Sequence, residues 1–268
     1  MGEIMKKIAF LTVLVIALGF TSCDDFFSNS FGKPRKYDVS KIDVNAGNVD
    51  KWIDIAIGNP ELAAALAEKI IQELDKTSGK EKAKLMDAGV KLSVESSGLG
   101  ESLLSNSADI LADLANADTD ELEDILTKLF ENIRNDFNSG GGQKAADNIT
   151  AIASKDIEPN PLNNGDAPQF GQEYRDTASP GDVAEAILVL VLGELGDDDI
   201  EDWNKLPRLD LAYDPEAGGF VVKNGDPSPN QITVAAYLNL IIVGGDKFND
   251  NPLTSAIKEG FDLASLVL

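Results

Sequence analysis

The sequence predicts a mostly α-helical fold, either an irregular helical bundle or an array of α-hairpins, with one small β-hairpin near residues 209–223. Apolar residues return at helical spacing in several segments, as Leu122, Ile125, Leu126 and Leu129 do. Hydrophobic residues make up 43% of the chain and aromatic ones 6%, which suits a core of small side chains. Because no fixed period returns the same residue types, we favour an irregular bundle over a regular repeat.

The first half of the chain predicts a series of helices joined by short turns. Asn48 precedes the first helix, and Asn59 and Pro60 supply a cap and a first-position proline for the second, residues 60–76. We expect this pair to form a helical hairpin. Further helices are expected over 80–96, 100–115, 119–136 and 143–154, with the glycine-rich residues 138–142 as a break.

The second half combines an irregular stretch with two strongly apolar helices. Residues 156–180 are rich in proline and glycine, which predicts a long loop or linker. Residues 183–195 and 232–243 are apolar on every side but too short to span a membrane, so we expect central buried helices. Between them, two short apolar runs flank residues 214–218, which is typical of a hairpin.

The amino terminus has the layout of an exported protein. Lys6 and Lys7 precede an apolar run, residues 8–20, which is shorter than the roughly 20 residues needed to span a bilayer, so a cleaved signal peptide is favoured. The following residues, Phe20-Thr21-Ser22-Cys23, resemble the lipobox of bacterial lipoproteins. The resemblance implies a diacylglycerol on the Cys23 sulfur, cleavage before Cys23 and acylation of the new amino terminus. The alternative is an accidental thiol beside an ordinary cleavage site.

A second resemblance concerns the residues around the cysteine. Ser22-Cys23-Asp24-Asp25-Phe26-Phe27-Ser28 and the acidic helices behind them are similar to helical lipoproteins of spirochaetes. That resemblance implies lipid anchoring in the cell envelope, on the periplasmic or the cell-surface side of a membrane, and brings no catalytic motif. We therefore expect a signal peptide (1–22), a lipidated flexible tether (23–45), an amino-terminal helical lobe (46–155), a loop or linker (156–180) and a carboxy-terminal helical lobe packed on the first (181–268).

Composition excludes several classes of function. The net charge of -23 becomes -24 once residues 1–22, with Glu3, Lys6 and Lys7, are removed. Such a charge repels nucleic acid and favours cationic partners. The chain has no histidine and a single cysteine, so Ser-His-Asp and Cys-His catalysis and His/Cys zinc sites are absent. No cofactor is expected, and catalysis would depend on carboxylates, lysine, tyrosine or a metal held by oxygen.

Two acidic segments are candidates for metal sites. Asp197-Asp198-Asp199, with Glu201 and Asp202, could collect Ca²⁺ but lacks the ligand spacing of a calcium loop, so a solvated loop is favoured. Residues 116–120 begin like an EF-hand loop, but Glu121 and Thr127 stand where its glycine and its twelfth acid belong. Helix capping explains that segment better. No metal ligand is predicted.

Aromatic residues supply the candidate ligand contacts. Trp203 and Tyr174 lie near irregular segments, where large amphipathic side chains can line a groove. Trp52 shares a helix face with Ile53 and Ala56 and is expected to pack in the core.

We expect a non-catalytic, membrane-anchored lipoprotein that binds an envelope protein. The alternatives are a carrier of a small ligand or lipid for a transporter, and a carboxylate-based hydrolase of envelope polysaccharide. The hydrolase alternative predicts two facing acids, one with a raised pKa.

Overall fold

The computed structural model describes residues 37–99, 121–158, 167–195, 211–214, 216–223, 227–243, 246–249 and 254. About 70% of these residues are helical, and the rest include two small antiparallel hairpins. The mostly α-helical prediction is therefore confirmed. The expected helix over residues 100–115 and residues 23–36 of the expected tether (23–45) lie outside the described ranges. In residues 37–45 of that segment, Ile42 and Val44 are buried in the core, so this part packs on the domain.

Three successive helices follow a short 3₁₀ helix and agree closely with the predicted boundaries. Their bounds are Val39–Lys41 (η1), Val49–Ala56 (α3), Pro60–Leu74 (α4) and Gly79–Ser96 (α5). Asn59 caps α4 as predicted, because its Oδ1 accepts from the Leu62 amide at 3.1 Å. The prediction that Asn48 caps α3 through its side chain was wrong. Its Oδ1 accepts from the Asn45 amide at 2.9 Å, so it braces the preceding loop instead of the helix.

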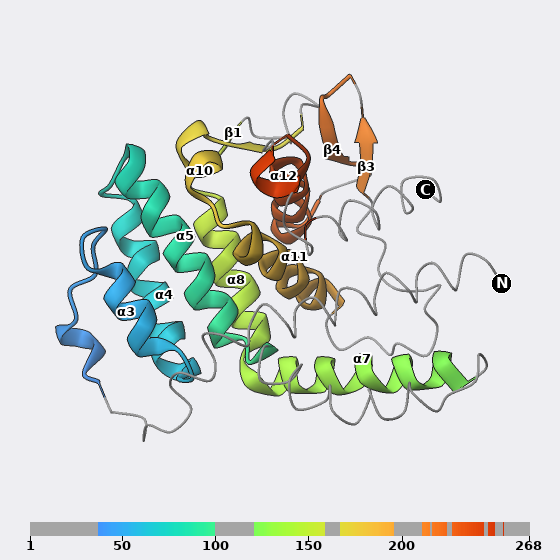
Figure 1. Cartoon of the computed structure of the whole chain (residues 1–268), viewed down its shortest axis with the longest axis horizontal. Helices are drawn as coiled ribbons and strands as arrows, with labels where there is room; N and C mark the ends of the chain where they lie inside the picture. The colour runs from blue at the N-terminus through green and yellow to red at the C-terminus, as the bar shows by residue number, and fades with distance from the viewer. Residues whose placement is uncertain are drawn as a thin grey trace.

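The glycine-rich break is shorter than predicted. Helix α7 (Glu121–Gly140) continues through residues 138–140, and α8 (Gly142–Ala153) begins two residues later. Gly141 alone makes the turn, with φ of 94° in the left-handed region that glycine tolerates best. Figure 1 shows α7 running sideways from the lower end of α8, away from α3 and α4.

The two apolar segments of the second half form α11 (Pro180–Leu195) and α12 (Pro229–Val243), as predicted, and each helix begins three residues earlier than expected. A capping box starts α12. Ser228 Oγ accepts from the Gln231 amide at 3.1 Å, and Gln231 Oε1 accepts from the Ser228 amide at 2.9 Å. Among the described residues, no helix combines the length and the apolarity that a membrane span needs.

The predicted hairpin is present, and a second one was missed. Its strands are β3 (Leu211–Asp214) and β4 (Gly219–Val222), which pair antiparallel. Within 156–180, predicted to be irregular throughout, β1 (Ile157–Glu158) pairs with β2 (Gln169–Phe170), and α10 (Gln172–Thr177) follows. Helix α13 (Asp246–Asn249) lies beyond α12.

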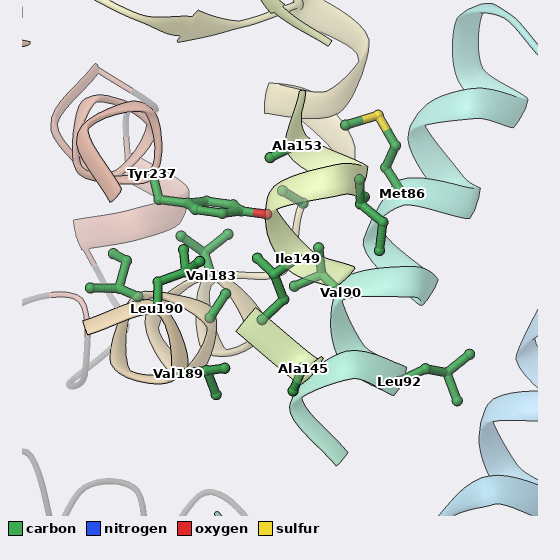
Figure 2. Close-up of a cluster of buried hydrophobic side chains, with 14 of the residues drawn as sticks. Met86, Val90, Leu92, Ala145, Ile149, Ala153, Val183, Val189, Leu190 and Tyr237 are labelled. Atoms are coloured by element: carbon green, nitrogen blue, oxygen red, sulfur yellow. The ribbon is translucent and has the colours of Figure 1, made fainter. Parts of the chain in front are cut away.

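A single cluster of buried apolar side chains links both halves of the described chain. Helix α5 is at its centre and touches α3, α4, α8, α10 and α11. Figure 2 shows side chains of α5, α8, α11 and α12 meeting in this cluster, among them Val90, Ile149, Leu190 and Tyr237. Trp52, which was expected in the core, is partly buried and packs against it.

Candidate functional site

The residues that the sequence singled out are only partly within the described ranges. Cys23 and Trp203 lie outside them, as do the acidic segments 116–120 and 197–202. Tyr174 lies within them, on α10. The structure therefore describes the surroundings of Tyr174 alone among the candidate ligand contacts.

Tyr174 is buried in the core, with 1% of its surface exposed. Its ring centroid lies 4.7 Å from that of Phe170, which in turn lies 4.9 Å from that of Tyr237 on α12. The hydroxyl oxygens of Tyr174 and Tyr237 are 3.4 Å apart. Because the Tyr174 side chain is buried, its predicted contact with a ligand needs an opening of this region.

Beside this tyrosine pair, α5 carries a row of charged residues. Asp87, Lys91 and Glu95 are spaced four residues apart, which places them on one side of the helix. Asp87 Oδ1 accepts from the Ser179 amide, at the start of α11, at 2.9 Å. Burial raises the pKa of the Asp87 carboxyl, while the Ser179 hydrogen bond and the charges of Lys247 and Lys91 act in the opposite direction.

Helix α11 adds the carboxyl groups of Asp182 and Glu185 to the charged residues of α5. Glu185 is partly buried, and its pKa is raised from 4.5 to about 7, chiefly by burial and also by the charges of Asp182 and Glu95. The charge of Lys91 opposes this shift. Glu95 is itself held from the other side, because its Oε1 accepts from the Gly58 amide, in the turn between α3 and α4, at 2.7 Å.

The remaining partners come from α10, α12 and α13. Burial raises the pKa of both Tyr174 and Tyr237, and the nearby charges of Asp87 and Asp182 add to the shift. Burial lowers the pKa of the Lys247 ammonium, against the attraction of Asp87 and Asp176. We use the name charged seam for the groups that these interactions connect: Asp87, Lys91, Glu95, Asp182, Glu185 and Lys247, with Tyr174 and Tyr237 behind them.

The charged seam can hold a proton near neutral pH. A carboxyl with a pKa near 7 exchanges its proton in the range where an ordinary glutamate stays ionised. Such a group can serve as a general acid or as a pH-dependent structural contact. Within the part of the chain that the structure describes, no three histidine, cysteine, aspartate or glutamate side chains converge as metal ligands.

The sequence indicated the helices of the charged seam but not the seam itself. Asp87, Lys91 and Glu95 have the spacing of an ordinary solvated helix face. The signal that could have revealed them is the wide distribution of apolar residues around α5, which leaves little room for a solvated face. For α11, the run 187–192 predicted burial, and Glu185 stands two residues before it.

Comparisons of the chain with protein-family models, with curated proteins and with solved structures give no match.

Proposed function

We propose that the chain is a lipid-anchored envelope lipoprotein whose acidic helical surface binds a protein partner without catalysis. The observation that carries the proposal is the position of its single cysteine, Cys23, directly after an apolar run and Thr21-Ser22. Acyl chains on that residue would bind a bilayer with about 0.8 kcal/mol per buried CH₂, so several chains suffice for a stable anchor.

The surface charge supports a cationic partner. Many of the described lysines bind the protein's own acids: Lys84 pairs with Asp50 at 2.7 Å, and Lys144 pairs with Glu68 at 2.6 Å. Others donate to backbone carbonyls, as Lys69 does to Ile42 at 2.7 Å. Since the chain has 46 acidic and 23 basic residues, the surplus is carboxylate, and exposed examples are spread over four helices: Glu61, Glu81, Glu131 and Glu173.

The anchor is tested by expressing the full chain with its own signal and labelling cells with an alkyne analogue of palmitate. We expect the wild type to carry the label and to sediment with membranes, and Cys23→Ser to do neither. The matched control is the double variant Cys23→Ser/Ser28→Cys, which keeps one thiol five residues away and should stay unlabelled. If Cys23→Ser attached to membranes as well as the wild type does, the proposal of a lipid anchor on Cys23 would be wrong.

Partner binding is tested with a zero-length carbodiimide, which joins carboxylates to lysine amines in direct contact. Intact cells producing the full chain should yield one dominant adduct with an envelope protein. Its yield should fall as salt rises, because exposed charges are screened beyond about 10 Å at 0.1 M ionic strength. The absence of any adduct contradicts the binding role, and an adduct that does not respond to salt contradicts its electrostatic basis.

The charged seam favours a second candidate, a carboxylate-based hydrolase of envelope polysaccharide. The supporting observation is the raised pKa of Glu185 together with the nearby carboxylates Asp182 and Glu95. Peptidoglycan incubated with the full chain should then be cut, and the cutting should stop in Glu185→Gln but continue in the exposed-site control Glu131→Gln. Uncut peptidoglycan leaves the binding role as the better proposal.

A further inference from the structure

We propose that residues 37–48 form a clasp on α3 and α4 that limits how far the domain can move from the bilayer, so that its partner is a protein bound to the same membrane. The clasp itself is independent of the proposed function. Its effect on reach rests on the lipid anchor and the partner proposed above, and adds where the two proteins meet.

Two side chains of the clasp are buried in the core, although this segment was expected to belong to the tether. Ile42 is 8% exposed and Val44 3%, whereas residues 41, 43 and 45 are exposed. The backbone of Ile42 is extended, with φ of -80° and ψ of 123°. Such an alternation is that of an extended chain with one face on the domain. Release of the clasp would expose both aliphatic side chains to water, which favours the seated position.

Hydrogen bonds hold the backbone of the clasp at three points. Lys69 Nζ, on α4, donates to the Ile42 carbonyl at 2.7 Å. Asn48, directly before α3, donates from Nδ2 to the Asp43 carbonyl at 3.0 Å, and its Oδ1 accepts from the Asn45 amide at 2.9 Å. Because Lys69 lies 27 residues beyond Ile42 in the chain, its bond depends on the folded domain.

An aromatic contact fixes the start of the clasp. The ring of Tyr37 meets the ring of Trp52 on α3 edge to face, with centroids 6.2 Å apart and planes at 90°. Figure 1 shows η1, which belongs to the clasp, beside α3 on the side of the bundle away from α12 and the β3–β4 hairpin. The chain from Cys23 therefore joins the domain at one defined edge.

Chain length then sets a limit on reach. Fourteen residue steps lead from Cys23 to Tyr37, and fully extended they span at most about 50 Å. With the clasp released, 26 steps would lead to Val49 and span at most about 90 Å. The clasp thus removes nearly half of the reach that the chain would otherwise have. A cationic partner must present its surface close to the anchoring bilayer, as a protein bound to that membrane does.

Trypsin tests the clasp, with the full chain as substrate and mass spectrometry of the fragments as the measurement. The Lys41 side chain is 82% exposed, but Ile42 beyond the bond to be cut is buried. We expect this bond to survive in the wild type and to be cut roughly tenfold faster in Val44→Ser/Lys69→Met, because cleavage follows the open population. The control Lys144→Met removes another lysine and should resemble the wild type. Equal cutting of wild type and double variant overturns the clasp, whether or not the chain is lipidated.

The limit on reach is tested by the yield of the carbodiimide adduct in intact cells. Fourteen glycine and serine residues inserted before Tyr37 double the chain between the lipid and the clasp. For a partner near the same bilayer, the effective concentration and the yield should fall roughly threefold. Yields in the Cys23→Ser background should not respond to the insertion. An unchanged or higher yield in the anchored chain overturns the limit, whereas a lack of adduct in every chain contradicts the proposed binding role and leaves the clasp to the trypsin result.

Discussion

Asn239 on α12 and Phe220 on β4 are joined by two hydrogen bonds in the core. The Phe220 amide donates to Asn239 Oδ1 at 2.6 Å, and Asn239 Nδ2 donates to the Phe220 carbonyl at 3.1 Å. Nδ2 also donates to the carbonyl of Pro168 at 2.9 Å. One buried amide therefore attaches both the β3–β4 hairpin and the chain segment before β2 to α12.

We expect Asn239→Ala to lower the free energy of unfolding by about 3 kcal/mol, because it leaves two carbonyls and one amide without these partners in the core. Urea denaturation of the full chain measures this. The control is Thr233→Val on the same helix, whose hydroxyl donates to the Pro229 carbonyl one turn earlier. It should cost less than about 1 kcal/mol. Equal effects of the two variants would contradict the attachment role of Asn239.

A matching prediction concerns Gly219, the residue before Phe220. A Cβ added there would lie 2.4 Å from Asn239 Oδ1 and 2.8 Å from its Cγ. Since three hydrogen bonds hold that amide in place, it cannot move aside, and we expect Gly219→Ala to cost roughly 1–3 kcal/mol. In Gly219→Ala/Asn239→Ala the two nearest obstructing atoms are gone, so the combined loss should be smaller than the sum of the single losses. Additive losses in a double-mutant cycle would exclude this contact.

Local signals predicted the helices well because they act within a few residues of the chain. Asn59 and Pro60 start α4 by a cap and a fixed φ, and both are readable without knowing the fold. Gly141 ends α7 through its own backbone conformation. Ser139 and Gly140 beside it are also typical of a helix end, but they stay helical. The sequence therefore indicated the break and misplaced its boundary.

Long-range contacts could not be predicted in the same way. Strands β1 and β2 have two residues each, too few to show an alternating pattern, and Phe170 is held by its packing on Tyr174 and Tyr237. The charged seam was missed for the same reason, because its residues come from helices far apart in the chain. Periodicity shows that Asp87 and Lys91 share a helix face, but not that Asp87 meets the Ser179 amide at the start of α11.

Burial of Tyr174 leads to a prediction on stability. Tyr174→Ala should cost about 3–5 kcal/mol, since it leaves a cavity beside Phe170 and Tyr237. Tyr213, with 47% of its surface exposed, provides the control. Tyr213→Ala loses mainly an edge-to-face contact with Phe220 and should cost about 1 kcal/mol or less. Thermal or urea unfolding compares the two, and a small loss for Tyr174→Ala would show that this region is loosely packed.

The effect of Glu185 on overall stability has a sign opposite to that of most acidic residues. Its pKa is about 7 in the folded protein and 4.5 at its ordinary value, so the folded state binds the proton more tightly than the unfolded chain. The stabilisation is complete below about pH 4.5 and is lost as the pH rises through 7. A shift of this size corresponds to about 3 kcal/mol at most. Asp87, whose pKa burial also raises, acts in the same direction.

Glu185→Gln should therefore be more stable than the wild type at pH 8, by up to about 3 kcal/mol, and similar to it at pH 5. Urea midpoints of the full chain at the two pH values measure the difference. The strongly negative net charge also disfavours the compact state as the pH rises, so Glu131→Gln is needed as a control that removes one exposed charge. That control should stay within about 0.5 kcal/mol of the wild type at both pH values. If Glu131→Gln gained as much stability at pH 8 as Glu185→Gln, general repulsion would explain the effect and the partly buried position of Glu185 would not.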